Sequence, residues 1–334
     1  MNDSGRLALE IQDLSVEYRT DEGTVHAVNG LDLAIESGRA LGLVGETGAG
    51  KTTAALSVLR LIPEPPGRVT GGRIMLYGED VFSKSEKEMD DLRGRQVSMI
   101  FQDPMTALNP VFTVEDQIAE SIEIHENLSR QDSLEKARRT LEMVGIPGGR
   151  GREYPHQFSG GMRQRVVIAI ALACSPSLLI ADEPTTALDV TIQAQVLEMM
   201  KELRARYRTS LLMITHDLGV VAEICDDVSV IYAGTVLEHG SLEDVFENTR
   251  HPYTEGLFNS LPDLDNRTVR LKPIKGLMPD PTNLPGGCAF HPRCAYAMPI
   301  CEKEKPGRAF RGEKHFVRCH LYDRDAVEGR LSRR

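Results

Sequence analysis

The eight residues Gly45 to Thr52 constrain the fold of this 334-residue chain more than any other feature. Their sequence, Gly-Glu-Thr-Gly-Ala-Gly-Lys-Thr, fits the pattern G-x-x-x-x-G-K-S/T. The apolar run Ala40–Val44 precedes the pattern, and Thr52–Leu61 follows it with apolar residues at helical spacing. A buried strand, a Gly-rich turn and a helix in this order predict a loop whose backbone N–H groups bind phosphate at a helix N-terminus.

The side chains of this loop predict a nucleotide with a bound magnesium ion. We expect Lys51 to bridge the β- and γ-phosphates and the Thr52 hydroxyl to bind Mg²⁺, which prefers oxygen ligands. The residues expected to contact the nucleotide are Gly45, Glu46, Thr47, Gly48, Ala49, Gly50, Lys51, Thr52 and Thr53.

A second apolar run ends in two carboxylates. Leu178–Ala181 is followed directly by Asp182 and Glu183, and open α/β sheets bind ligands at the carboxyl ends of their strands. We expect Asp182 to bind the metal and Glu183 to polarise a water for attack on the γ-phosphate. Such a pair alone is more often a solvated strand end, but a phosphate loop in the same sheet favours the catalytic interpretation.

The remaining patterns predict a parallel sheet with flanking helices. A strand is expected at Ser210–Thr215 after a helix at Ile192–Tyr207, and Val228–His239 is expected to be a strand pair that turns at Ala233-Gly234. Residues from about 104 to 172 are interpreted as an inserted helical subdomain, with helices at Gln117–His125, Ser133–Val144 and Met162–Ala173. Prolines become frequent after Pro252, so we expect the core domain to end near residue 250.

Composition excludes several classes of protein. The formal net charge of −10 argues against a protein that binds mainly nucleic acid. The longest apolar stretch, Val166–Ala181, is interrupted by Ser175-Pro176-Ser177, so no bilayer-spanning helix is expected. Met1–Glu10 lacks the apolar region of a secretory signal, which makes the cytoplasm the expected compartment.

Several motifs in the chain together resemble those of a known family. Phe158-Ser-Gly-Gly-Met-Arg-Gln-Arg165 resembles the signature motif of ABC-type ATPases, although that motif more commonly has other residues at Phe158 and Met162. The phosphate loop, Gln102, Asp182-Glu183, Ala187-Leu188-Asp189 and His216 follow in the order and approximate spacing of that family. The resemblance spans about Leu7 to Gly240. It implies an α/β fold, a P-loop NTPase (ABC ATPase) core with an antiparallel β subdomain and a helical subdomain.

The resemblance also implies roles for single residues. Tyr18 is similar to the aromatic that stacks on adenine, Gln102 to the residue that senses Mg²⁺ and water, and His216 to the switch histidine that contacts the γ-phosphate and positions Glu183. Asp189 is similar to the acid that communicates between two subunits. Each residue also has a plain structural explanation: a packed strand tyrosine, a surface glutamine, a strand-end histidine.

In this family the phosphate loop of one subunit meets the signature of another. Ser159, Gly160 and Gly161 are therefore expected to contact the γ-phosphate in trans, in a dimer that encloses two ATP molecules. A serine at the start of a helix is otherwise an ordinary N-cap.

The cysteines are concentrated at one end of the chain. Cys288, Cys294, Cys301 and Cys319 lie in the C-terminal part, whereas Cys174 and Cys225 are interpreted as core residues. The spacings match neither zinc ribbons nor the bacterial ferredoxin pattern. An all-thiolate 4Fe–4S cluster is the favoured interpretation. Zinc is the alternative, with His291, His315 and His320 nearby, and unliganded or disulfide-bonded cysteines are a third.

A second resemblance covers about residues 250–322. Gly276–Pro281, Gly286–Cys294, Cys319-His320-Leu321 and His251-Pro252-Tyr253-Thr254 resemble the tail of oligopeptide and dipeptide importer ATPases. This resemblance supports the 4Fe–4S cluster and divides the chain into an ATPase domain, 1–250, and a cysteine-rich metal-binding segment, 251–334.

Together the resemblances imply the ATP-hydrolysing subunit of a peptide importer. Such a subunit lies at the cytoplasmic face of the cell membrane with two permease subunits, a second ABC ATPase and an extracytoplasmic substrate-binding protein. The alternatives are the ATPase of a related nickel or other metal importer and a soluble ABC ATPase that has no role in transport.

Overall fold

The core of the fold is an eight-stranded sheet, seen in a computed structural model that describes residues 6–102, 107–186, 188–260 and 272–323. Its strand order is β11-β12-β10-β9-β3-β8-β7-β6. The five strands β9, β3, β8, β7 and β6 are parallel, and β10, β12 and β11 extend the sheet in antiparallel fashion. The bounds are β3 Ala40–Val44, β6 Val97–Ile100, β7 Leu178–Asp182, β8 Ser210–Thr215, β9 Asp227–Tyr232, β10 Thr235–Ser241, β11 Ala309–Phe310 and β12 Phe316–Val317.

The central strands are buried on both faces. All residues of β3, β7 and β8 are buried, as expected for a parallel sheet covered on two sides. Side chains alternate between two apolar clusters: Leu41 and Leu43 contribute to one, and Ala40 and Val44 to the other. The alternation explains why these segments are continuous apolar runs.

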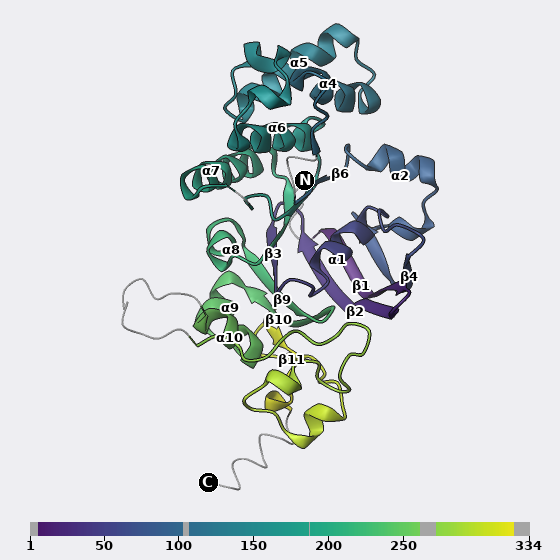
Figure 1. The fold of residues 1–334 in the computed structure, drawn as a ribbon, viewed down its shortest axis with the longest axis vertical. Helices are drawn as coiled ribbons and strands as arrows, with labels where there is room; N and C mark the ends of the chain where they lie inside the picture. The colour runs from purple at the N-terminus through teal and green to yellow at the C-terminus, as the bar shows by residue number, and fades with distance from the viewer. Residues whose placement is uncertain (1–5, 103–106, 187, 261–271, 324–334) are drawn as a thin grey trace.

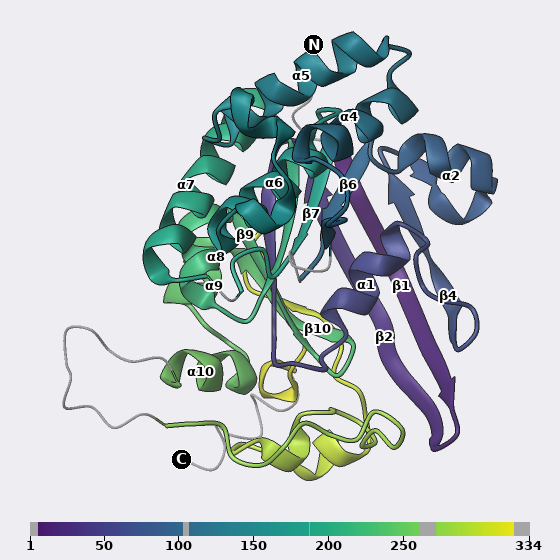
Figure 2. The same cartoon turned by 45° about the horizontal axis from the view of Figure 1, so that its top comes forward.

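A second, four-stranded antiparallel sheet covers one of these faces (Figure 2). Its order is β2-β1-β4-β5, with β1 Leu7–Thr20, β2 Gly23–Glu36, β4 Gly67–Leu76 and β5 Glu79–Asp80. Helix α1, Lys51–Val58, shares its apolar cluster with this sheet and the central one. After β5 the chain forms the 3₁₀ turn Val81–Ser83 and then helix α2, Glu86–Leu92.

The remaining helices contribute side chains to the apolar cluster on the other face of the central sheet. Helices α4, α5 and α6 form a separate group at one end of the molecule (Figure 1). The bounds are α4 Val114–His125, α5 Arg130–Met143, α6 Gly160–Leu172, α7 Val190–Tyr207, α8 Leu218–Ile224, α9 Leu242–Glu247 and α10 Pro252–Asn259. None of the helices in the described ranges is long and apolar enough to cross a membrane.

The C-terminal segment lies at the opposite end from α4, α5 and α6 in both views (Figures 1 and 2). It consists mainly of turns, with 3₁₀ turns at His291–Arg293, Pro299–Glu302 and His320–Tyr322. Strand β12 pairs with β10 of the core, Glu238 opposite Val317. The segment is therefore attached to the edge of the central sheet.

The segments expected from sequence are present, with bounds that differ by a few residues. The expected helix at Thr52–Leu61 is α1, the strand pair at Val228–His239 is β9 and β10, and the three helices expected between 104 and 172 are α4, α5 and α6. The first residues of that helical region, 104–106, lie outside the described residues. The antiparallel subdomain implied by the family resemblance is the sheet of β1, β2, β4 and β5.

Candidate functional site

The phosphate loop connects β3 to α1 and lies against strand β2 and the turn between β9 and β10. Gly50 has φ 97°, and a Cβ there would lie 2.3 Å from the carbonyl oxygen of Ala27 on β2. Only glycine fits this position. The N–H of Gly234, in the turn between β9 and β10, donates to the Ala49 carbonyl at 2.9 Å. The loop is thus fixed by β2 and the β9–β10 turn as well as by the elements it joins.

Lys51 and Thr52 lie at the first turn of α1. Lys51 is only 7% exposed, and its Nζ donates to the carbonyls of Gly45 at 2.7 Å and Glu46 at 3.0 Å. Burial lowers the pKa of Lys51, opposed by the carboxylates of Glu183, Asp182 and Glu46. An ammonium surrounded by loop carbonyls in this way can exchange them for phosphate oxygens.

Asp182 brings the end of β7 to the loop. The Thr52 hydroxyl donates to Asp182 Oδ2 at 2.7 Å. Burial raises the pKa of Asp182; the Thr52 hydrogen bond and Lys51 oppose this, and neighbouring Glu183 adds to it. A hydroxyl and a carboxylate in contact are hard oxygen donors of the kind that suit Mg²⁺.

Glu183 is held by three side chains. Its Oε2 accepts hydrogen bonds from Gln102 Nε2 and Thr186 Oγ1, both at 3.0 Å, and its Oε1 lies 2.9 Å from His216 Nδ1. Its backbone has φ 47°, and its N–H donates to the Ile214 carbonyl at 2.8 Å. Burial would raise the pKa of Glu183, but the hydrogen bonds from His216 and Thr186 outweigh it and lower the pKa. The group is therefore an ionised carboxylate with a fixed direction.

Sequence reasoning did not identify Thr186, although it belongs to this group. It follows Glu183 by three residues, and its N–H donates to the Glu183 carbonyl at 3.1 Å. The turn Glu183–Thr186 after β7 brings the Thr186 hydroxyl to the carboxylate, which is a local signal that the sequence contains.

Tyr18 approaches the loop from β1. Its hydroxyl lies 3.5 Å from Thr53 Oγ1, and its half-buried ring packs against the cluster shared by α1 and the antiparallel sheet. The structure therefore places Tyr18 next to Thr53 of the predicted nucleotide site and also gives the ring a packing role.

The signature residues begin α6 and are separate from the phosphate loop of the same chain. Ser159 caps α6, its Oγ accepting from the N–H of Met162 at 3.3 Å. Ser159 and Gly160 are exposed. In the part of the chain that the structure describes, no hydrogen bond joins Ser159, Gly160 or Gly161 to residues 45–53.

Asp189 lies beside this helix start. It caps α7 by accepting from the N–H of Ile192 at 2.9 Å, and Ile192 packs so closely on Gly161 that a Cβ there would lie 2.5 Å from Ile192 Cγ2. Ala187, part of the same sequence motif, lies outside the described residues. The exposed starts of α6 and α7 thus form one surface.

The C-terminal part of the chain reaches the phosphate loop at Glu46. The N–H of Glu46 donates to the hydroxyl of Tyr253 at 2.9 Å, and Arg293 Nη1 lies 2.9 Å and 3.1 Å from the two carboxylate oxygens of Glu46. These partners are 207 and 247 residues away along the chain. No local pattern in the sequence predicts them.

The four C-terminal cysteines lie together. Cys288, Cys301 and Cys319 are buried and Cys294 is half-buried, and none of the six cysteines forms a disulfide. The N–H of Cys288 donates to the Cys301 carbonyl at 2.8 Å. The pKa of Cys319 is raised to about 12, mainly by burial and in smaller part by the thiols of Cys288, Cys294 and Cys301. The four side chains are therefore close enough to interact electrostatically.

Their arrangement does not match a site for one ion. Within residues 6–102, 107–186, 188–260 and 272–323, no group of three or more His, Cys, Asp or Glu side chains is placed to hold a metal ion. A tetrahedral zinc site needs four donors around one centre at about 2.0–2.3 Å. In these ranges the structure therefore shows neither the expected 4Fe–4S site nor the zinc alternative with His291, His315 or His320.

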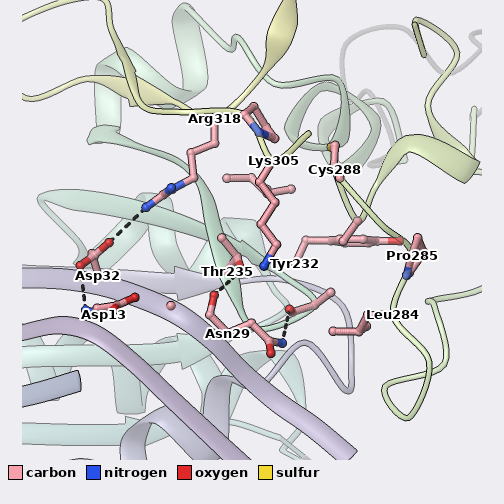
Figure 3. Close-up of a pocket in the computed structure, with 16 residues that line it drawn as sticks. Asp13, Asn29, Asp32, Tyr232, Thr235, Leu284, Pro285, Cys288, Lys305 and Arg318 are labelled. Carbon is pink, nitrogen blue, oxygen red and sulfur yellow. Dashed lines mark hydrogen bonds and ion pairs between the residues drawn. The ribbon is translucent and has the colours of Figure 1, made fainter. Parts of the chain in front are cut away.

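A cavity of about 460 Å³ separates part of the C-terminal segment from the core (Figure 3). Asn29 and Asp32 of β2, Tyr232 and Thr235 of the β9–β10 hairpin, and Cys288, Lys305 and Arg318 of the segment line it. Arg318 closes one side with an ion pair to Asp32 at 3.1 Å. Contacts between segment and core therefore surround the cavity.

Comparison with known families gives two matches on this chain. The sequence model of the ABC transporter family matches residues 28–186, and that of the oligopeptide/dipeptide transporter C-terminal region matches residues 237–301. The first range includes the phosphate loop and Glu183, and the second includes Tyr253 and Arg293.

Curated relatives match over nearly the whole chain. The dipeptide transport ATP-binding protein DppD of Bacillus subtilis is 48% identical, covering 97% of this chain and 97% of that protein. The oligopeptide transport ATP-binding protein OppD of the same organism is 48% identical, covering 95% of this chain and 90% of that protein.

Solved structures share the fold. A dimeric ATP-binding cassette, MJ0796, bound to ADP and Pi, has a TM-score of 0.63 at 23% identity and covers 70% of this chain and 98% of its own. CbiO1 of Clostridium perfringens, part of the ABC transporter complex cbiONQ, also has a TM-score of 0.63, at 26% identity, covering 72% of this chain and 91% of its own.

Proposed function

The chain belongs to the ATP-binding proteins of the ABC transporter family, which hydrolyse ATP, and from this premise we propose that it powers the import of dipeptides or oligopeptides. Two observations beyond the family support this: the match of residues 237–301 to the oligopeptide/dipeptide transporter C-terminal region, and identities of 48% to two peptide-transport ATP-binding proteins. The same similarities favour peptides over nickel and favour a transporter over a soluble ABC protein without a permease.

We assign the chemical step to Glu183, on the observation that its carboxylate is oriented by Gln102, Thr186 and His216 together. An ionised carboxylate fixed in this way can orient a water for in-line attack on the γ-phosphate and accept its proton. His216 holds Oε1 of Glu183, and its proposed second role is contact with the γ-phosphate. Lys51 supplies the positive charge that attracts the phosphates.

Thr52, Asp182 and Gln102 are the residues proposed to hold Mg²⁺. The contact between the Thr52 hydroxyl and Asp182 places two oxygen donors side by side, and Gln102 contributes a side-chain oxygen nearby. Mg²⁺ held by these residues would supply positive charge to balance the charge on the phosphate oxygens.

The active unit is proposed to be a dimer. Ser159, Gly160 and Gly161 are at the start of α6, where free N–H groups attract an anion, yet they make no hydrogen bond to their own phosphate loop within the described ranges. We propose that these N–H groups bind the γ-phosphate of an ATP held in the phosphate loop of a second ABC ATPase. Asp189 shares that surface, and its proposed role is communication across the dimer.

The helical subdomain is the proposed contact with two permease subunits at the cytoplasmic face of the membrane. Phe101, which precedes Gln102 in the sequence, and Val111 and Phe112, which precede α4, are exposed apolar side chains. Apolar residues that are exposed together mark interaction sites. A permease bound there is connected to Glu183 through Gln102. Delivery by an extracytoplasmic binding protein completes the proposed importer, which needs no nucleic acid.

Residues 251–334 are proposed to be a C-terminal segment with a structural 4Fe–4S cluster held by Cys288, Cys294, Cys301 and Cys319. The donor set fits, because four thiolates are the usual ligands of such a cluster. The four thiols are gathered and at least half-buried, and none of them forms a disulfide. Metal binding adds stability to a segment built mainly of turns.

Reconstitution tests the transport function. The chain is incorporated into proteoliposomes with its permeases, a second ATPase and the binding protein, and uptake of labelled di- and tripeptides is measured. We expect ATP-dependent uptake that Glu183→Gln abolishes. Stimulation of ATP hydrolysis by nickel-loaded but not peptide-loaded binding protein would contradict the proposal.

Anaerobic purification tests the cluster independently. Iron and sulfide in about four copies each per chain, with the broad visible absorbance of iron–sulfur clusters, are expected. A colourless protein with one zinc ion per chain would replace the cluster by zinc and leave the ATPase assignment unchanged.

A further inference from the structure

Glu46, the second residue of the phosphate loop, is held at both its backbone and its side chain by residues that follow the ATPase core. Tyr253 of α10 accepts from its N–H at 2.9 Å, and Arg293 pairs with both oxygens of its carboxylate at 2.9 Å and 3.1 Å. Two independent contacts thus fix one residue of the loop that binds ATP.

The two partners are themselves fixed. Tyr253 is 0% exposed, and its ring packs against Tyr232 of β9 and Phe290 with ring centroids 4.7 Å and 5.3 Å away. The Arg293 side chain is 6% exposed, its Nε donates to the Lys275 carbonyl at 3.0 Å, and its Nη1 lies 3.4 Å from the Tyr232 hydroxyl. Glu46 is therefore attached to a rigid, largely buried group.

The charge of Glu46 makes this attachment relevant to ATP. The Glu46 carboxylate is close enough to interact electrostatically with Lys51, and the Glu46 carbonyl accepts from Lys51 Nζ at 3.0 Å. A free carboxylate at this position repels a triphosphate and competes with it for the ammonium group. An arginine whose Nη1 lies within hydrogen-bond distance of both carboxylate oxygens neutralises the carboxylate and fixes its direction.

We propose that Arg293 and Tyr253 are positioning residues for ATP binding: Arg293 neutralises Glu46 and holds it away from the phosphates, and Tyr253 fixes the loop backbone. The C-terminal segment, which carries Arg293, thereby controls the affinity of the core for ATP. This inference depends on ATP binding by the loop. It requires neither peptide transport nor an iron–sulfur cluster.

A double-mutant cycle on the purified full-length chain tests the role of Arg293. The Kd for a fluorescent Mg–ATP analogue is measured for the wild type, Arg293→Gln, Glu46→Gln and the double variant. Arg293→Gln is expected to raise the Kd about tenfold, because it leaves an unpaired carboxylate. In the Glu46→Gln background the same change is expected to alter the Kd less than about twofold. Arg293→Lys restores the charge and most of the affinity.

The cycle separates positioning from folding. If Arg293 only stabilised the C-terminal segment, its replacement would have the same effect whether residue 46 is Glu or Gln. Equal effects in both backgrounds, or a wild-type Kd for Arg293→Gln, would therefore overturn the proposal. In steady-state hydrolysis we expect a raised KM for ATP with kcat at saturating ATP unchanged.

Tyr253→Phe provides a second test that preserves the packed ring. It removes only the hydroxyl that accepts from Glu46, and the Kd is expected to rise about three- to tenfold. The matched control is Tyr322→Phe, which removes a hydroxyl that donates to the Arg250 carbonyl at 3.0 Å. The control is expected to bind ATP as the wild type does. Equal Kd values for the two variants would remove Tyr253 from the proposal.

Discussion

The ATPase core and the C-terminal segment differ in how much buried, regular secondary structure each contains. Strands β3, β7 and β8 of the core are buried along their whole length. In the described part of the segment, β11 and β12 have two residues each, and beyond helix α10 the remainder is mainly 3₁₀ turns and irregular structure. The segment attaches to the core by ion pairs and a strand pairing, such as Arg318 to Asp32 and β12 to β10. It also contributes buried side chains such as Phe290 and Phe316 to the apolar clusters of the core.

Because the segment has little regular structure of its own, its conformation depends on contacts with the core. Burial of apolar area gives the core its stability. The segment gains order from its contacts with the surface of the core. In return it supplies Arg293 to the phosphate loop, so the dependence runs in both directions.

Glu183→Gln is the largest effect expected, and it separates chemistry from binding within the core. The amide cannot accept a proton from water, so turnover is expected to fall about 10²- to 10⁴-fold. The Kd for ATP is expected to stay within about twofold, because the positions of Lys51 and Thr52 do not depend on this group. Steady-state hydrolysis and equilibrium binding measure the two quantities. Unchanged turnover would refute the assigned base.

A pair of truncations compares packing in the two regions. Leu43 lies at 0% exposure in β3, and Leu43→Ala is expected to lower the free energy of unfolding by about 2–5 kcal/mol. Phe310 in β11 is 58% exposed, and Phe310→Ala is expected to cost less than about 0.5 kcal/mol. Urea unfolding followed by circular dichroism gives both values. Similar losses would mean that the segment is packed as tightly as the core.

His251, at the junction of the two regions, predicts a pH dependence of stability. Burial lowers the pKa of His251 to about 3, from 6.5 for the unfolded side chain. The unfolded chain therefore binds the extra proton first, and stability falls as the pH falls below about 6.5. Between pH 7 and pH 5 this one group removes about 2 kcal/mol.

His251→Asn isolates that contribution. Asparagine can replace the ring nitrogen that accepts from the Tyr253 N–H at 3.0 Å and caps α10. Urea unfolding at pH 7 and pH 5 is compared for the wild type and the variant. The difference between their pH dependences measures the histidine, and parallel curves would show that it does not titrate as described.

The smallest effect is expected at an exposed ion pair between the regions. Lys314 of the segment pairs with Glu36 of β2, and the two side chains are 49% and 35% exposed. Lys314→Gln is expected to lower the free energy of unfolding by about 0–1 kcal/mol, and by less in high salt. Unfolding at low and high salt checks this. A large, salt-independent loss would indicate a structural role beyond the ion pair.

The sequence by itself determined the elements whose information is local. The apolar run Ala40–Val44, the glycines of the phosphate loop and the strand that ends at Asp182 could be located because burial and backbone conformation act on neighbouring residues. The same reasoning did not locate β2 or β4, whose residues are only partly buried. Their association in an antiparallel sheet followed from the family resemblance alone.

Only the tertiary structure decided which distant residues meet. The contacts of Glu46 with Tyr253 and Arg293, the gathering of four cysteines and the docking of β12 on β10 join residues far apart in the chain. The chemistry of a side chain limits which groups it can bind, but the fold determines which of those groups lies next to it. For that reason the sequence motifs predict the reaction, whereas only the three-dimensional structure shows the contacts on which the proposed control of the phosphate loop by the C-terminal segment rests.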